Sequence, residues 1–298
     1  MPELPEVETI VRDLNKKVLN RTFIDVWTDW KKTIKRPQDF NVFKKELKGK
    51  RIEKINRKGK NILFKLSGGK TLLIHQKLTG HLLLGKWGKQ DKIWKSLVPG
   101  PLADPMNRFL HLIFWLDDGK QLALSDLRKF AKVELANSRD IEESPELKSL
   151  GPDPLERSFT FSRFAEILKR KKGKIKQVLM DQTVISGIGN IYSDEMLWEA
   201  KIHPFKEASE LKRGELRKIF KAMKEVLRKA VELRGESFSD FRDLEGKKGY
   251  FDKARKVYRR EGEKCPRCGT KIERKKIGGR SAHFCPKCQN YKTSYYKV

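Results

Sequence analysis

The sequence predicts an α+β protein, and three observations lead to this prediction. Short apolar segments separated by glycine-containing turns occupy residues 22–135, apolar residues at helical spacing occupy residues 160–233, and all four cysteines lie near the C-terminus. Short strands joined by turns are typical of a β-sandwich or barrel, whereas apolar residues three and four apart indicate helices with one buried face. We therefore expect a short helix and a β-sandwich, then a helical domain, then a small metal-binding module.

The β-sandwich domain is expected over residues 1–136. It begins with a short amphipathic helix after Pro5, because proline in the first turn and acidic residues beside it favour a helix start. Two hairpin turns are expected at residues 67–69 and 117–119, where glycine separates runs of β-forming residues. The strands around these turns are expected at residues 62–66, 71–74, 109–116 and 121–124.

Residues 137–155 are expected to form a linker, because this segment is acidic and aperiodic and contains serine and proline. The helical domain is expected over residues 156–236, and Arg234 and Gly235 end its last helix. Residues 237–298 are basic and glycine-containing and hold the cysteines. One buried helix face is marked by Leu216, Ile219, Phe220, Met223, Leu227 and Ala230.

The composition indicates a globular protein with a polyanionic partner. Hydrophobic residues make up 38% of the 298 residues, and 68 Lys and Arg against 39 Asp and Glu give a formal net charge of +29. This surplus favours nucleic acid as the partner, although a generally basic proteome or a thermophile's charged surface is an alternative. A membrane surface is disfavoured because no lipidation signal or long apolar run occurs. Since the N-terminus lacks a signal peptide, we expect a cytoplasmic protein.

The cysteines form two Cys-x2-Cys pairs with sixteen residues between them: Cys265, Cys268, Cys285 and Cys288. This spacing is typical of a zinc site. Four thiolates leave no coordination position for water, so we expect one structural Zn²⁺ per chain. Two disulfides are the alternative, which a cytosolic location disfavours.

The N-terminus begins Met-Pro-Glu-Leu-Pro-Glu-Val-Glu, an acidic start on a basic protein. If Met1 is removed, Pro2 presents a secondary amine, which can attack an electrophilic carbon and form an iminium ion without a cofactor. Glu3 and Glu6 are spaced so that both carboxylates can lie close to that nitrogen. The alternative is that Pro2 only permits removal of the methionine.

A glycine-containing turn, Val-Ile-Ser-Gly-Ile-Gly-Asn-Ile-Tyr, occupies residues 184–192 between two helical stretches. Gly187 and Gly189 permit a tight turn whose amides can face a phosphate, and Asn190 adds a neutral donor at the start of the next helix. By itself this pattern favours an ordinary helix–helix turn. Dinucleotide binding is disfavoured because the third glycine is missing.

Taken together and in this order, the N-terminal segment, the turn and the cysteine module resemble the formamidopyrimidine-DNA glycosylase family, also called helix-two-turn-helix glycosylases. The resemblance covers essentially the whole chain and includes residues 180–204, 250–251 and 279–280. Leu4 resembles the residue found at this position in the branch that acts on oxidised purines, whereas the endonuclease VIII branch usually has glycine there. The resemblance implies a helix-two-turn-helix domain and a zinc-ribbon β-hairpin.

The resemblance also implies a mechanism. Pro2 would attack C1′ of a damaged nucleotide and expel the base, and elimination from the iminium would cut the strand on both sides of the sugar. Glu3 would act as acid or base at the sugar and Glu6 as a supporting carboxylate. Lys60 is similar to a lysine that contacts phosphate and assists elimination, although a solvated basic strand is an alternative for it.

An everted base leaves a void in the duplex, which the family fills with an apolar wedge, an arginine and a phenylalanine. These correspond to Leu78, Arg128 and Phe130. The wedge is usually methionine, so Leu78 is a departure that keeps apolar bulk and loses flexibility. A packed apolar strand residue is the alternative for Leu78.

Further DNA contacts are implied for His75, Lys176, Asn190 and Arg280. Arg280 is expected in the loop of the zinc hairpin, where its guanidinium suits a phosphate. A packed strand histidine is the alternative for His75. The loop at residues 237–249 is expected to cover the everted base, and a further departure lies at residues 107–111, where many relatives are rich in histidine.

The sequence therefore predicts a bifunctional DNA glycosylase and apurinic/apyrimidinic lyase of base excision repair. Its expected substrates are 8-oxoguanine and formamidopyrimidines in double-stranded DNA, and the protein is expected to act as a monomer. One alternative is an endonuclease VIII-like enzyme for oxidised pyrimidines. The other is a non-catalytic zinc-ribbon protein that binds nucleic acid, but a binder has no need of the Pro2 amine.

Overall fold

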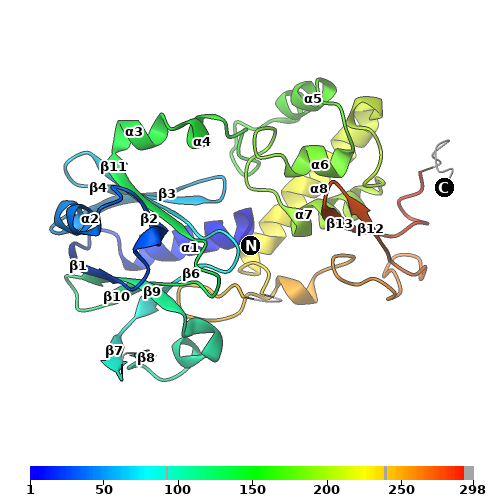
Figure 1. Ribbon diagram of the computed structural model, residues 1–298. Helices are drawn as coiled ribbons and strands as arrows, with labels where there is room; N and C mark the ends of the chain where they lie inside the picture. The colour runs from blue at the N-terminus through cyan, green and yellow to red at the C-terminus, as the bar shows by residue number, and fades with distance from the viewer. Residues whose placement is uncertain (92, 238–239, 292–298) are drawn as a thin grey trace. The chain divides into compact units, whose positions relative to one another are not determined.

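The structure, a computed structural model, describes residues 1–91, 93–237 and 240–291 (Figure 1). Its internal contacts divide the chain into two compact units. The first unit combines Met1–Lys148 with Val231–Asp252, and the second combines Ser149–Ala230 with the chain from Lys253 onward.

Two stacked sheets form the body of the first unit (Figure 1). One sheet has the order β1-β9-β10-β6, with bounds Phe23–Thr28, Leu110–Leu116, Gln121–Ser125 and His81–Gly85. The other has the order β2-β11-β5-β4-β3, with bounds Ile34–Arg36, Lys132–Asn137, Lys70–His75, Asn61–Leu66 and Ile52–Lys58. All neighbouring strands in the two sheets pair antiparallel except β11 and β2. The predicted sandwich and both predicted hairpins are confirmed.

The core of the sandwich is closed by helix α1, Leu4–Lys17, together with the inner faces of both sheets. Val7, Ile10 and Leu14 lie on one face of α1 and have no exposed surface. The Phe23 ring packs against Phe64 and Phe114 with ring centroids 6.4 and 5.4 Å apart. Burial of this apolar surface fixes the first turns of α1, and with them the N-terminus, on the sandwich.

Shorter elements complete the first unit. They are α2 (Phe40–Leu47), the hairpin β7 (Trp87–Gln90) and β8 (Ile93–Ser96), and 3₁₀ turns at Lys31–Thr33, Pro101–Ala103 and Pro105–Asn107. The expected linker contains two short helices, α3 (Ser138–Glu142) and α4 (Pro145–Lys148). They form because Ile141 and Leu147 are buried, which the acidic composition of the segment obscures.

The second unit consists of helices followed by a β-hairpin. Its elements are α5 (Phe161–Lys169), α6 (Ile175–Met180), α7 (Asn190–Ala200), a 3₁₀ turn at Ala208–Glu210, most of α8 (Arg213–Glu232), part of a 3₁₀ turn at Phe251–Lys253, and the strands β12 (Glu273–Ile277) and β13 (Arg280–Phe284). The buried face predicted for α8 is confirmed: Ile219, Met223 and Leu227 have no exposed surface. Within the described ranges, no helix is both long and apolar enough to cross a membrane.

Candidate active site and DNA-binding residues

The N-terminal segment is held by the carboxylate of Glu6, which is 1% exposed. Glu3 and Glu6 form a capping box at the start of α1, in which Glu6 Oε2 accepts the backbone N–H of Glu3 at 2.7 Å. Glu6 Oε1 accepts the backbone N–H of Glu236 at 2.7 Å. One side chain therefore fixes the N-terminus to a segment 230 residues later in the chain.

Gly235 makes this contact possible. Its φ is +81°, and a Cβ at this position would lie 2.7 Å from Glu6 Oε1. Any larger residue would push the carboxylate away, and the left-handed conformation would add strain. Two further bonds hold the same segment, because Arg234 pairs with Asp13 of α1 and with Asp243. These contacts explain why Val231–Asp252 groups with the first unit. From the sequence, this segment is expected to belong partly to residues 156–236 and partly to residues 237–298.

The N-terminal amine lies among charges of both signs. The pKa of the Met1 amine is below its ordinary value, first because burial removes water from the ammonium, and the Lys60 ammonium lowers it further. The carboxylates of Glu3, Glu6 and Asp240 act in the opposite direction. Pro2 is buried one residue later, and Lys60 is 7% exposed in the turn between β3 and β4. The structure thus brings Glu3, Glu6 and Lys60 together at the N-terminus.

Asp240 also belongs to this charge cluster, although it is not among the residues predicted from the sequence. It follows residues 238 and 239 of the predicted lesion-covering loop, and those two residues lie outside the described ranges. Nothing in the local sequence distinguishes Asp240 from other acids. Only the return of the chain to the N-terminus places its carboxylate near the amine.

The three residues expected to fill the void lie on two loops of the first unit. Leu78 is half-buried in the loop between β5 and β6, while Arg128 and Phe130 lie in the loop between β10 and β11, where Phe130 is 50% exposed. The Arg128 guanidinium lies 4.8 Å from the centre of the Phe130 ring, a cation–π contact that prearranges the pair. The neighbouring Leu127 is 48% exposed and is a further apolar side chain on the same loop.

His75 ends β5 immediately before the loop that carries Leu78. Burial lowers the pKa of His75 to about 4, and Lys77 contributes to this shift, so the ring is neutral at pH 7. Its Nδ1 accepts the backbone N–H of Lys77 at 2.9 Å. The ring proton is therefore on Nε2, which is a donor suited to a phosphate oxygen.

In the second unit, the glycine-containing turn begins helix α7. Asn190 is the first residue of α7 after Gly189, and Gly187 has a φ of +92°. The Gln182 side chain holds the turn by donating to the Ile188 carbonyl at 2.7 Å and accepting the Gly187 N–H at 2.9 Å. The turn thus presents a helix N-terminus, a position that favours anions.

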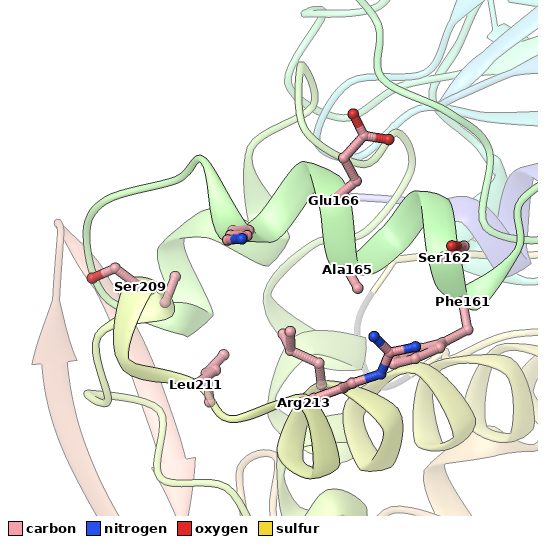
Figure 2. Close-up of a pocket in the computed structure, with 10 residues that line it drawn as sticks. Phe161, Ser162, Ala165, Glu166, Ser209, Leu211 and Arg213 are labelled. Atoms are coloured by element: carbon pink, nitrogen blue, oxygen red, sulfur yellow. The ribbon is translucent and has the colours of Figure 1, made fainter.

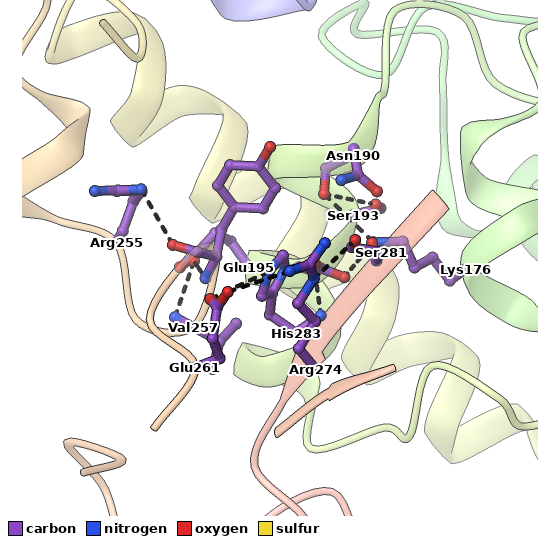
Figure 3. A network of polar contacts seen from close by, with 12 residues as sticks. Lys176, Asn190, Ser193, Glu195, Arg255, Val257, Glu261, Arg274, Ser281 and His283 are labelled. Atoms are coloured by element: carbon purple, nitrogen blue, oxygen red, sulfur yellow. Dashed lines mark hydrogen bonds and ion pairs between the residues drawn. The ribbon is translucent and has the colours of Figure 1, made fainter. Parts of the chain in front are cut away.

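Lys176 is not placed on the surface. Its side chain is 0% exposed, and its ammonium pairs with Asp194 and donates to the Ser281 carbonyl at 2.8 Å (Figure 3). It also reaches the Asn190 carbonyl at 3.5 Å. Burial does not favour the expected direct contact with DNA. Lys176 instead links the backbone of the turn to the backbone of the hairpin.

Arg280 is exposed and is the first residue of β13, directly after the Gly278–Gly279 turn, rather than within the hairpin loop. The hairpin is attached to α7 through Asp194, whose Oδ2 accepts the His283 backbone N–H at 3.0 Å and contacts His283 Nδ1 at 2.9 Å (Figure 3). These contacts fix the strand on which Arg280 lies.

The cysteine sulfurs converge in the second unit. The four Sγ atoms of Cys265, Cys268, Cys285 and Cys288 lie within 4.8 Å of one another. The 3.4 Å between the sulfurs of Cys268 and Cys285 is too long for a disulfide, which requires about 2.05 Å. Four sulfurs at this separation fit a tetrahedral ion with Zn–S bonds of about 2.3 Å. Trp198 Nε1 donates to Cys265 Sγ at 3.4 Å, which supports the thiolate form. The cluster is consistent with one structural Zn²⁺.

A surface pocket of about 510 Å³ lies in the second unit between α5 and the start of α8 (Figure 2). Phe161, Ala165 and Leu211 give it an apolar lining, and the Arg213 guanidinium lies 5.8 Å from the centre of the Phe161 ring. None of its lining residues belongs to the predicted site.

Three family profiles match the chain. The formamidopyrimidine-DNA glycosylase N-terminal domain matches residues 1–133, the H2TH domain of the same family matches residues 150–242, and the zinc finger found in FPG and IleRS matches residues 262–290. A protein named formamidopyrimidine-DNA glycosylase from Desulforamulus reducens is 38% identical over 98% of this chain and 100% of its own length. One of the same name from Symbiobacterium thermophilum is 40% identical over 97% of this chain and 89% of its own length.

Solved structures agree with the sequence matches. A mutant of the Lactococcus lactis FPG in complex with a Fapy-dG containing DNA has a TM-score of 0.84 and 34% identity, covering 97% of this chain and 100% of that chain. A structure of MutM in complex with carbocyclic 8-oxo-G containing DNA has a TM-score of 0.83 and 35% identity, with the same coverage. Together with the N-terminal charge cluster, the glycine-containing turn at residues 184–192 and the four-cysteine site, these matches show that the chain belongs to the formamidopyrimidine-DNA glycosylase family.

Proposed function

We propose that the protein is a bifunctional DNA glycosylase and apurinic/apyrimidinic lyase that removes 8-oxoguanine and formamidopyrimidines from DNA. The observation that carries this proposal is the buried N-terminus, where Pro2 lies with Glu3, Glu6 and Lys60. Relatives that match this chain over their whole length are named formamidopyrimidine-DNA glycosylases, and structures of relatives have been solved in complex with DNA containing Fapy-dG, carbocyclic 8-oxo-G or an abasic site. This support favours oxidised purines over the oxidised pyrimidines of the alternative branch.

The chemistry follows from the secondary amine that Pro2 carries once Met1 is removed. The neutral nitrogen forms a bond to C1′, the C1′–N glycosidic bond breaks, and its electron pair leaves with the base, which takes a proton. The nitrogen then loses its proton, its lone pair forms the C=N bond as the C1′–O4′ bond breaks, and O4′ takes a proton, which gives the iminium ion. Loss of a proton from C2′ then expels the 3′ phosphate. A second elimination expels the 5′ phosphate. Burial lowers the pKa of the Met1 amine, and Pro2 is buried beside it, so we expect burial to favour the neutral Pro2 nitrogen that the first step requires.

The charged groups around the amine have distinct roles in this proposal. Glu3 is the acid or base at the sugar, because it directly follows Pro2 and is buried. Glu6 positions the N-terminus, because both its oxygens accept backbone N–H groups. Lys60 contacts a phosphate of the damaged strand and assists elimination.

Binding to double-stranded DNA uses both units. Leu78, Arg128 and Phe130 fill the void left by the everted base, and His75 donates from Nε2 to a phosphate. Asn190 and Arg280 contact the backbone, with the structural Zn²⁺ holding the hairpin that carries Arg280. Lys176 has a positioning role, because its ammonium is buried on Asp194 and the Ser281 carbonyl. We propose that the protein acts as a monomer, since a single chain supplies every residue named. We also propose that it acts on DNA in the cytoplasm.

Borohydride trapping tests the proposal. A duplex with 8-oxoguanine opposite cytosine should give a covalent protein–DNA adduct after reduction, because reduction fixes the iminium on Pro2. Pro2→Gly, or protein that retains Met1, should give none, while folding as the wild type does by circular dichroism. An adduct on thymine glycol alone would assign the protein to the oxidised-pyrimidine branch. Absence of an adduct on either lesion would leave a protein that only binds nucleic acid.

A further inference from the structure

One buried carboxylate organises the loop between β10 and β11. Asp126 is 1% exposed; its Oδ2 accepts the backbone N–H of Ala131 at 2.7 Å and its Oδ1 accepts that of Arg128 at 3.3 Å. The Asp126 carbonyl accepts the Lys129 N–H at 3.1 Å and closes a turn. The backbone of the loop is thus wrapped around Asp126, while the Arg128 and Phe130 side chains reach the surface.

The same carboxylate is connected to the loop between β5 and β6. The Thr79 hydroxyl, 47 residues earlier in the chain, donates to Asp126 Oδ1. The Thr79 oxygen also accepts the Arg128 backbone N–H at 3.1 Å. Thr79 is 7% exposed, so water competes little for these bonds. A single hydroxyl therefore joins the loop of Leu78 to the loop of Arg128.

The backbone that carries Leu78 is closed into a tight turn next to Thr79. The loop closes through a bond from the Gly80 N–H to the Gln76 carbonyl at 3.1 Å. A Cβ on Gly80 would lie 2.4 Å from the Gln76 carbonyl oxygen, so the turn requires glycine. Leu78 is thereby carried on a tight turn directly before the bridging Thr79.

We propose that Thr79 and Asp126 are positioning residues that hold Leu78 and the Arg128–Phe130 pair as one insertion unit. This inference rests on the proposed function, in which these three side chains fill the void. Everting a paired base costs a few kcal/mol of stacking and pairing, and side chains that fill the void offset part of that cost. A bridge that holds both loops in one arrangement would let the three side chains enter the void together. An abasic sugar has no base to unstack. The bridge therefore matters for base excision and much less for cleavage at an existing abasic site.

Thr79→Val tests the bridge because it removes the hydroxyl and keeps the shape. Single-turnover excision of 8-oxoguanine opposite cytosine should slow about tenfold, the effect expected for loss of hydrogen bonds to a charged group. Cleavage of the same duplex with a preformed abasic site should stay within about twofold of the wild type. Thr79→Ser, which keeps the hydroxyl, should restore excision. 2-Aminopurine beside the lesion should show less unstacking in Thr79→Val.

Thr71→Val is the matched control. It removes another buried hydroxyl of the first unit, which bonds to Ser138 at 2.7 Å outside the two loops, and should leave both reactions unchanged. Asp126→Asn is a second variant, because a neutral amide cannot accept from Thr79, Arg128 and Ala131 together, and it should show the same selective loss.

The two proposals fail in different ways. A wild type that cleaves neither duplex would overturn the proposed function. A wild type that cleaves both, with Thr79→Val and Asp126→Asn either unaffected or equally slowed on both duplexes, would overturn the positioning role and leave the bridge as a purely structural contact.

Discussion

The reactivity of the N-terminal amine depends on opposing effects of its neighbours. Burial and the Lys60 ammonium lower the pKa of the Met1 amine, while the carboxylates of Glu3, Glu6 and Asp240 raise it, and we expect the same neighbours to act on the Pro2 amine once Met1 is removed. The neutral form, which can attack carbon, is favoured by the first group of effects and opposed by the second. Among the three acids, Asp240 comes from a different part of the chain, so it can be changed without altering the start of α1.

Asp240→Asn should therefore move the pH dependence of adduct formation. Loss of the carboxylate removes a group that stabilises the ammonium, so the pKa of the Pro2 amine should fall and the acidic limb of the rate profile should shift to lower pH. Borohydride trapping across pH measures the shift. Asp117→Asn, in the exposed turn between β9 and β10, serves as the control and should not move the profile. A shift of the Asp240→Asn profile to higher pH would contradict this electrostatic account.

Two acids of helix α7, Asp194 and Glu195, are buried and have structural roles. Asp194 binds Lys176 and His283, and Glu195 accepts the backbone N–H groups of Lys256, Val257 and Tyr258 at 2.8 to 3.0 Å. Burial raises the pKa of Glu195, and these hydrogen bonds oppose the rise. Charged residues on a helix usually face water, so sequence reasoning places such residues on the surface. The DNA contact expected for Lys176 rests on the family resemblance, and the burial of its ammonium on Asp194 does not favour that contact.

Lys176→Met should destabilise the second unit by about 3–5 kcal/mol, because it leaves the Asp194 carboxylate buried without its cation. Adding Asp194→Asn should recover part of this loss, since the neutral amide still accepts the His283 N–H. Urea denaturation measures both variants. If Lys176 contacted DNA directly, the single variant would keep its stability and lose only affinity for DNA.

Across the whole molecule, only part of the net charge of +29 is available to bind DNA. Many cations already pair with acids, as Arg139 does with Glu143 and Arg170 with Glu166. Such exposed pairs contribute little to stability, and they reduce the charge available to phosphates. The salt dependence of binding separates cations that displace counterions from those that do not.

Arg280→Ala should lower the slope of log Kd against log salt concentration by about 1, because each phosphate contact releases close to one counterion. Fluorescence anisotropy between about 50 and 200 mM salt measures the slope. Arg139→Ala, an exposed arginine of α3 paired with Glu143, should leave the slope unchanged. An unchanged slope in Arg280→Ala would remove Arg280 from the DNA contacts.

Features that depend on neighbouring residues can be predicted from the sequence alone. The hairpin turns at residues 67–69 and 117–119, the buried face of α8 and the four-cysteine spacing are short-range patterns, and periodicity or spacing reveals them. The N-terminal chemistry of Pro2 and Glu3 was visible for the same reason, because both residues lie at one end of the chain.

Contacts between residues far apart in the sequence could not be predicted and are seen only in the folded protein. Folding brought Asp240 to the N-terminus, buried Lys176 on Asp194, and joined Thr79 to Asp126 across 47 residues. It also carried Val231–Asp252 back to the first unit through Gly235 and Glu6. The physical reason is that these contacts follow from the packing of sheets and helices, and burial then decides whether a charge faces water, a partner or a substrate. No pattern of neighbouring residues predicts which of these a given charge will face.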